Sequence, residues 1–257
     1  MSRPGALRDG VRLATGTLTV LPVPAPVTVD REAAGRAMAL AGLVALLPGS
    51  LVALVGWAGS ALGAPPLLVG AVAVGALAWS SRGLHLDGLA DTADGLAASY
   101  DRERALAVMR TGDVGPIGAA TLVLVLLAQV ACVAALVEQP LLSGAAVVVS
   151  RAVLALACAS GVPAARSDGL GAMVAGSVPR WAAGSAVLLA GVVVTLAALA
   201  SGTPWWSGPL AAALAVLAAG AVLVRCTRRL GGITGDVLGA LVEVSLAATL
   251  AVLATAA

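Results

Sequence analysis

Seven long apolar runs follow one another along the chain, and this repetition limits its fold more strongly than any other feature. They cover roughly residues 37–58, 66–82, 116–137, 140–160, 181–200, 206–224 and 237–256. A helix needs about 20 apolar residues to cross a bilayer, and most of the runs reach that length. Only 11% of the residues are charged, against roughly 25% in soluble domains. We therefore predict an all-α, polytopic integral membrane bundle of about seven spans, forming one membrane-embedded domain over residues 1–257.

The arginines predict the orientation of this bundle. All 15 basic residues are Arg, and 14 of them lie in four segments, 1–36, 82–115, 161–180 and 225–236. Arg and Lys collect on the cytoplasmic side of membrane proteins, so these segments and the N-terminus are expected there. Residues 1–36 are interrupted by prolines and are predicted to form an interfacial arm. The absence of Lys and Phe, whose codons are AT-rich, indicates a GC-rich bacterium and hence the bacterial inner membrane.

Acidic residues follow the same distribution, although they contribute little to orientation. Of the 13 acidic residues, 11 lie in the four arginine-bearing segments. The densest group is HLDGLADTADGL at 85–96, in the expected cytoplasmic Asp-rich segment 83–115. In a helix, Asp87, Asp91 and Asp94 fall within a sector of about 60°. Crowded carboxylates favour a bound Mg²⁺ or Mn²⁺. The alternative is a solvated acidic helix without a ligand.

Three further ionisable groups stand out near or within the spans. Asp236 and Glu243 are seven residues apart and share one face of a helix. Arg151 lies inside the fourth run. Ionisable groups inside spans are candidates for function because charges there are costly. We hypothesise that Arg151 faces a polar cavity shared with Glu243 or with a substrate phosphate.

His85 and Arg166 are less clearly assigned. His85 lies about 200° from Asp87 on a helical wheel, so it joins the acidic site only if the helix begins after it; otherwise it packs. Arg166 belongs to the glycine-rich segment 165–180 and is a candidate phosphate ligand. An ordinary loop arginine on the cytoplasmic side is an equally good interpretation of this residue.

Together these motifs resemble a known enzyme family. The chain resembles bacterial adenosylcobinamide-GDP ribazoletransferase, also called cobalamin synthase. The resemblance covers nearly the whole length, and its most specific part is HLDGLADTADG in order with TGD. The matching stretches are LPVP at 21–24, GLHLDGLADTADGL at 83–96, VMR at 108–110, VGPIGA at 114–119, SR at 150–151, DGLG at 168–171 and RLGGITGDVLGA at 229–240.

The resemblance implies a Mg²⁺-dependent exchange at a diphosphate, in which α-ribazole or its 5′-phosphate attacks adenosylcobinamide-GDP and GMP leaves. It implies metal and diphosphate binding by Asp87, Asp91 and Asp94. Asp236 is expected to be a further metal ligand or the general base that accepts the hydroxyl proton. The residues expected to contact the substrates are His85, Arg110, Asp113, Arg151, Arg166 and Glu243. Many members have Asp directly after the Met-Arg or Met-Lys pair, whereas this chain has Thr111, which leaves the role of Asp113 open. The expected partners are these small molecules and the lipid bilayer, with no nucleic acid; a homo-oligomer is left open.

Two other functions compete with this interpretation. CDP-alcohol phosphotransferases use comparable Asp-rich metal chemistry, but their pattern has Ala-Arg where this chain has Asp91 and Thr92. A proton- or ion-coupled transporter would explain Arg151 and Glu243, because such proteins bury charges near the midplane. It would not explain three Asp residues at the edge of the membrane.

Overall fold

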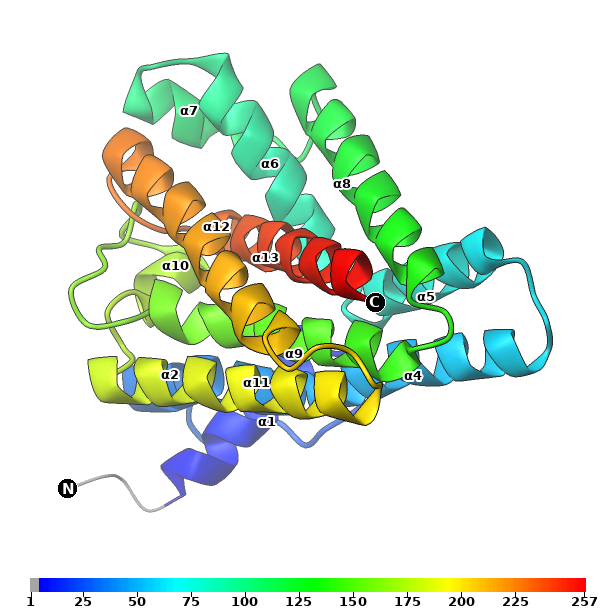
Figure 1. Ribbon diagram of the computed structural model, residues 1–257. Helices are drawn as coiled ribbons and strands as arrows, with labels where there is room; N and C mark the ends of the chain where they lie inside the picture. Colours follow the sequence, from blue (N-terminus) through cyan, green and yellow to red (C-terminus); the bar gives the residue numbers. More distant parts are fainter. Residues whose placement is uncertain (1–4) are drawn as a thin grey trace.

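The computed structural model describes residues 5–257, and these fold into thirteen helices without a β-strand (Figure 1). The helices are α1 (Ala6–Leu18), α2 (Arg31–Ala39), α3 (Ala41–Val44), α4 (Leu46–Ala61), α5 (Pro66–Ser80), α6 (Leu84–Ala98), α7 (Arg102–Val108), α8 (Pro116–Ala135), α9 (Pro140–Ala157), α10 (Gly169–Val174), α11 (Arg180–Ala200), α12 (Ser207–Leu230) and α13 (Gly235–Ala256).

Six helical segments of the described chain are long and apolar enough to cross a membrane. They are Ala41–Ala61, which joins α3 and α4, and the single helices α8, α9, α11, α12 and α13. Helices α5 and α6 meet the same test only together, as a pair bent by 90°. The predicted all-helical membrane fold is confirmed, with six or seven spans. Its orientation in the membrane stays a prediction.

Helices α9 and α13 form the centre of the bundle. Helix α9 packs against α4, α11 and α13, and α13 also packs against α6, α8 and α12. Nearly every residue of α9 is buried, whereas α8, α11 and α12 expose leucines such as Leu124, Leu188 and Leu217. Because lipid is as apolar as these side chains, an exposed Leu costs nothing at a lipid-facing surface. The core therefore lies around α9 and α13, and the outer helices face lipid.

The chain turns sharply between α5 and α6. Arg82 and Gly83 adopt φ values of 56° and 70°, a conformation that glycine tolerates and other residues rarely adopt. The turn directs α6 across α13 instead of continuing the line of α5, so that α6 lies against α7, α8 and α13 (Figure 1). The Asp-rich motif is therefore helical, and the bend holds it over one end of the central helices.

Arginines tie together the segments at this end of the bundle. Arg102 donates to the carbonyl of Ala165 at 2.8 Å, and Arg229 donates to the carbonyl of Ser99 at 2.5 Å. At the opposite end, Ser60 donates to Glu138 at 3.0 Å. The arginine-bearing segments thus gather at one end, as their distribution predicts. One boundary was wrong: α12 continues to Leu230 instead of ending near 224, so the arginines from 225 to 229 lie on a helix.

Candidate functional site

Close glycine contacts bring α6 against the start of α13. A Cβ atom on Gly88 would lie 2.6 Å from the carbonyl oxygen of Asp236, and one on Gly239 would lie 3.0 Å from that of His85. Real Cβ contacts are almost never as short as the first distance and rarely as short as the second, so glycine at position 88 is what permits the two backbones to approach so closely. The contact sets the Asp-rich helix beside Asp236, which is about 150 residues away along the chain.

The start of α13 is held by its own cap and by a neighbouring loop. The Thr234 hydroxyl accepts from the Val237 amide at 3.2 Å and donates to Asp236 Oδ2 at 3.2 Å. Ile233 donates to the carbonyl of Pro163, and its own carbonyl accepts from the Ala165 amide. A carboxylate in the first turn of a helix interacts favourably with the helix dipole. These bonds fix Asp236 at the helix start and bring the residue after Ala165 toward it.

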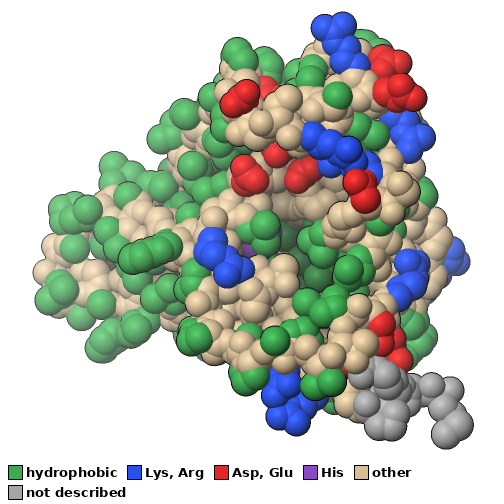
Figure 2. Space-filling model, turned by 180° about the vertical axis from the view of Figure 1, so that it is seen from behind, with side chains coloured by type: hydrophobic (Ala, Val, Ile, Leu, Met, Phe, Trp, Pro, Cys, Tyr) green, Lys and Arg blue, Asp and Glu red, His purple; other side chains and the backbone are tan. Residues whose placement is uncertain are grey.

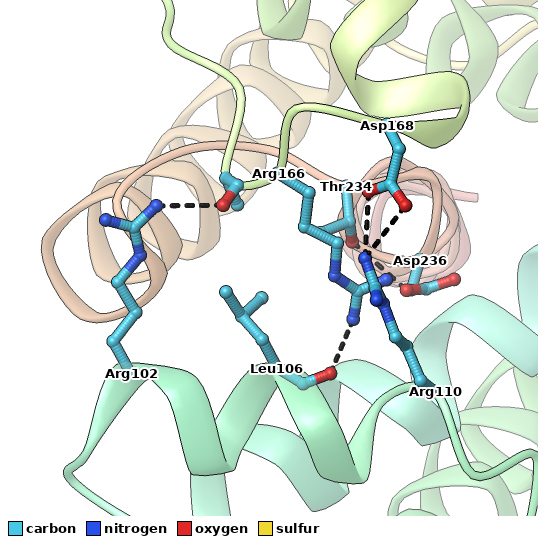
Figure 3. Close-up of polar contacts among 8 residues, drawn as sticks. Arg102, Leu106, Arg110, Arg166, Asp168, Thr234 and Asp236 are labelled. Atoms are coloured by element: carbon cyan, nitrogen blue, oxygen red, sulfur yellow. Dashed lines mark hydrogen bonds and ion pairs between the residues drawn. The ribbon is translucent and has the colours of Figure 1, made fainter.

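That residue is Arg166, the cation of the site. Its Nη2 donates to the carbonyl of Leu106 at 2.7 Å, which directs the guanidinium toward Asp236 and Asp168 (Figure 3). Burial lowers the pKa of Arg166, as does the nearby charge of Arg110, whereas the surrounding carboxylates raise it. Because the pKa of a guanidinium lies far above neutrality, Arg166 remains charged. It is thus placed to bind an anion next to Asp236.

Arg110 and Asp168 form an ion pair at the rim of the same region. Arg110 Nη2 lies 2.8 Å from Asp168 Oδ1 and 3.1 Å from Oδ2, and both side chains are more than half exposed. Exposed pairs contribute about 0–1 kcal/mol, so this one opens easily when a ligand competes for it. Asp168 lies in the DGLG stretch of the sequence and was not predicted to belong to the site.

Asp91 is buried among other carboxylates. Burial raises its pKa to about 6, with further contributions from the charges of Asp87, Asp236 and Asp94 and an opposing one from Arg166. The acidic residues therefore interact through space, and one arginine does not neutralise them.

Asp94 is directed elsewhere. The amide of Gly115 donates to its Oδ2 at 2.7 Å and the amide of Gly118 donates to its Oδ1 at 2.8 Å. A carboxylate that accepts from the free amides of a helix start satisfies donors that the helix itself leaves unpaired. Asp94 thus caps α8 and fixes it against α6. Its predicted role as a metal ligand stays a prediction, and the structure gives it a second role that is purely structural.

A cavity of about 280 Å³ lies between α1, α6, the 166–171 segment and the start of α13. Asp87, Arg166, Asp168 and Asp236 line its outer part. Figure 2 shows this hollowed face, with acidic side chains along one edge of the hollow and hydrophobic side chains inside it. The cavity therefore presents carboxylates and a guanidinium to whatever enters.

His85 lines the same cavity from a buried position. Its side chain is 3% exposed, and neither ring nitrogen has a hydrogen-bond partner among the described residues. Burial lowers its pKa well below the usual value, and the charge of Arg151 lowers it further. The helical wheel predicted that His85 would join Asp87 only if the helix began after it. In fact α6 begins at Leu84, and both residues nevertheless line the cavity.

Four predicted substrate contacts do not line this cavity: Arg110, which lies at the rim, and Asp113, Arg151 and Glu243. Arg151 donates to Ser150 Oγ at 2.7 Å, and Glu243 Oε2 accepts from Gln129 at 2.8 Å, both in the core of the bundle. Both residues lie in the described part of the chain, and they form no direct ion pair there, although their charges interact at longer range. Asp113 is exposed and lines a separate hollow. A substrate-binding role for these four residues stays a prediction.

Comparison with known proteins identifies the family. The model of the cobalamin-5-phosphate synthase family matches residues 10–254. The chain belongs to this family. A protein of Nocardioides sp. named adenosylcobinamide-GDP ribazoletransferase is 53% identical over 95% of this chain and 97% of its own length. Proteins of the same name are 42% identical in Frankia casuarinae (95% and 93% coverage) and 39% identical in Pseudomonas savastanoi pv. phaseolicola (94% and 97% coverage).

No solved structure matches the chain significantly. The family match confirms the prediction of a transferase of cobalamin biosynthesis. It decides against the CDP-alcohol phosphotransferase and the transporter, which the sequence had left as alternatives.

Proposed function

We propose that the chain joins adenosylcobinamide-GDP to α-ribazole or its 5′-phosphate at the cavity between α6 and α13. A ribazole hydroxyl oxygen bonds to the cobinamide-linked phosphorus, the bond from that phosphorus to the bridging oxygen breaks, and GMP leaves with this oxygen. The hydroxyl proton passes to a base. The observation that carries the proposal is that Asp87, Asp236 and Arg166 line one cavity in a chain whose relatives bear the ribazoletransferase name.

Each of these residues has a role that its position supports. Arg166, fixed by Leu106, binds non-bridging phosphate oxygens and stabilises the charge that develops there. Arg110 supplies a second guanidinium when its exposed pair with Asp168 opens. Asp236 orients the hydroxyl or accepts its proton, because it lies on the cavity wall next to Arg166.

The carboxylates fit Mg²⁺ bound together with a substrate. Among residues 5–257, no three His, Cys, Asp or Glu side chains converge tightly enough to hold a metal by themselves. Mg²⁺ is usually held by one or two carboxylates plus substrate phosphates, and Asp87 and Asp236 offer such a pair. Asp91 adds negative charge behind them. Bound there, Mg²⁺ would neutralise charge on the transferring phosphoryl group.

Metal dependence tests this proposal directly. We expect purified protein in detergent to release GMP from adenosylcobinamide-GDP and α-ribazole only with Mg²⁺ or Mn²⁺, and EDTA to abolish the release. Protonated Asp91 would weaken the metal site, so the apparent Mg²⁺ affinity should fall as pH drops through about 6, the raised pKa of Asp91. Full activity after exhaustive chelation would contradict the proposal.

The site faces the cytoplasm in this proposal, across the bacterial inner membrane. The support is that the arginine-bearing segments gather at the same end of the bundle as the cavity. Single cysteines at positions 60 and 104, in a chain lacking Cys132, Cys158 and Cys226, would report the topology. We expect a membrane-impermeant thiol reagent that reaches the periplasm to label Ser60→Cys and not Arg104→Cys; the reverse pattern would overturn the orientation.

A further inference from the structure

The orientation of Arg166 depends on helix α7. A guanidinium carries five N–H donors, but within residues 5–257 the side chain of Arg166 makes a single hydrogen bond, from Nη2 to the carbonyl of Leu106. One hydrogen bond does not stop a guanidinium from turning about it. The guanidinium therefore keeps its direction only as long as Leu106, on α7, stays fixed relative to the backbone of Arg166.

Arg102 fixes this relation from the same helix. Its Nη2 donates at 2.8 Å to the carbonyl of Ala165, the residue directly before Arg166. Residues 102 and 106 are four apart in α7 and therefore lie on one face of the helix. Figure 3 shows both bonds: Arg102 reaches from α7 to the neighbouring loop, and Arg166 reaches from that loop back to α7. Two bonds in opposite directions hold the segments against both sliding and rotation.

The space that Arg102 occupies is left open by a glycine. Gly231 follows α12 with a φ of 81°, and a Cβ atom there would lie 2.7 Å from Cζ of Arg102. The guanidinium thus lies against the C-terminal end of α12, where a cation interacts favourably with the helix dipole. On the other side of the same residue, the Ala165 amide donates at 2.9 Å to the carbonyl of Ile233. Arg102 therefore contacts both of the loops that supply charged residues to the cavity.

The other side-chain link between α7 and this loop region is weaker. The pair of Arg110 and Asp168 is more than half exposed, and exposed pairs contribute little. Ala165, in contrast, is 3% exposed. Without Arg102 its carbonyl would lose a partner that water does not easily replace in a buried place. The bond from Arg102 is thus the firmer of the two links.

We propose that Arg102 is a positioning residue, which holds Arg166 in the orientation that phosphate binding requires. The inference rests on the proposed function, because it takes Arg166 as a phosphate contact. Arg102 itself does not line the cavity, so it acts through Arg166 and not on a substrate. Its loss frees Leu106 and Ala165 to move apart, and the guanidinium of Arg166 then turns away from the place where charge develops.

A double-mutant cycle separates positioning from stability. Arg102→Ala is expected to lower kcat/KM for GMP release about tenfold, less than the roughly 10²-fold that a misplacement of about 1 Å can cost. Arg166→Ala should lower it about 10²-fold or more, as the loss of one charge-stabilising donor does. In the Arg166→Ala background, Arg102→Ala should change kcat/KM by less than about twofold, because no guanidinium remains to be positioned. Arg102→Lys, which keeps a cationic donor, should restore most of the activity.

Two further variants complete the experiment. Arg102→Met keeps the aliphatic stem without the donor and carries the same expectation as Arg102→Ala, so it takes its place if thermal unfolding shows that the alanine variant does not fold. Arg104→Ala removes an equal charge from the same helix, and the exposed side chain of Arg104 makes no hydrogen bond or ion pair within residues 5–257. This control should leave kcat/KM within about twofold.

The results distinguish this inference from the proposed function. Full activity of folded Arg102→Ala or Arg102→Met, or an undiminished loss when Arg102→Ala is added to Arg166→Ala, would overturn the inference and leave the proposed function standing. Full activity of folded Arg166→Ala would overturn the phosphate contact itself, and the positioning role of Arg102 with it.

Discussion

Replacing Asp236 with Asn is expected to lower kcat/KM for GMP release by about 10³-fold, the effect of losing several kcal/mol of transition-state stabilisation. Asp236 lines the cavity, and its charge interacts with Arg166. Whether it binds the metal or accepts the hydroxyl proton, the neutral amide does neither. Asn has nearly the same volume and still accepts from Thr234, so the fold should persist. Initial rates with both substrates, together with thermal unfolding in detergent, separate these effects.

Two matched variants make this result interpretable. Glu103→Gln removes an equal charge from the exposed first turn of α7 and should leave kcat/KM within about twofold. Asp94→Ala leaves the Gly115 and Gly118 amides unpaired and should chiefly lower stability, by about 1–3 kcal/mol. A folded Asp236→Asn variant with full activity would remove Asp236 from the chemistry.

Gly88→Ala is expected to lower both stability and activity. The added Cβ would lie 2.6 Å from the Asp236 carbonyl oxygen and 2.9 Å from its Cα, so α6 and α13 must separate. Forcing extra volume into a packed contact costs about 1–3 kcal/mol. The same shift would move His85 and Asp87 away from Asp236, and a misplacement of about 1 Å can cost roughly 10²-fold in rate. Thermal unfolding and initial rates measure the two effects.

Gly75→Ala is the control for this substitution. Gly75 also lies within a helix, α5, but a Cβ there would meet no atom within 4 Å. At such a site the change should leave the free energy of unfolding unchanged or raise it by about 0.4–1 kcal/mol. The gain arises because alanine has fewer conformations to lose from the unfolded chain than glycine has. If Gly88→Ala behaved like Gly75→Ala, the close contact between α6 and α13 would not be what positions the site.

Hydropathy predicted most of the bundle because a bilayer requires long apolar helices wherever the chain crosses it. The predicted run at 140–160 corresponds to α9, and that at 237–256 to α13. The run at 206–224 was too short because arginines broke the apolar pattern, although the helix continues to Leu230. Long Arg side chains at a helix end reach past the apolar region to the membrane surface. The first arginine therefore marked where the helix leaves the apolar layer, and the helix itself ends several residues later, at Leu230.

The helical wheel was less successful for the site. It grouped Asp87, Asp91 and Asp94 on one face, and all three lie on α6. It could not show that the Asp94 carboxylate bonds to the amides of α8, because those amides lie on another helix. It also set His85 apart from Asp87, although both line the cavity. Periodicity describes one helix, whereas a cavity is enclosed by several.

The sequence by itself determined that this protein is a helical membrane enzyme of the cobalamin synthase type, with its charges confined to a few segments. Hydropathy and charge are properties of residues that act on any chain in a bilayer, so they can be read without a structure. The tertiary structure decided which charges meet. It joined Asp87, Arg166 and Asp236 around one cavity and left Arg151 and Glu243 in the core. The physical reason is that glycine contacts and arginine-to-carbonyl bonds between distant segments, not spacing along the chain, set these distances.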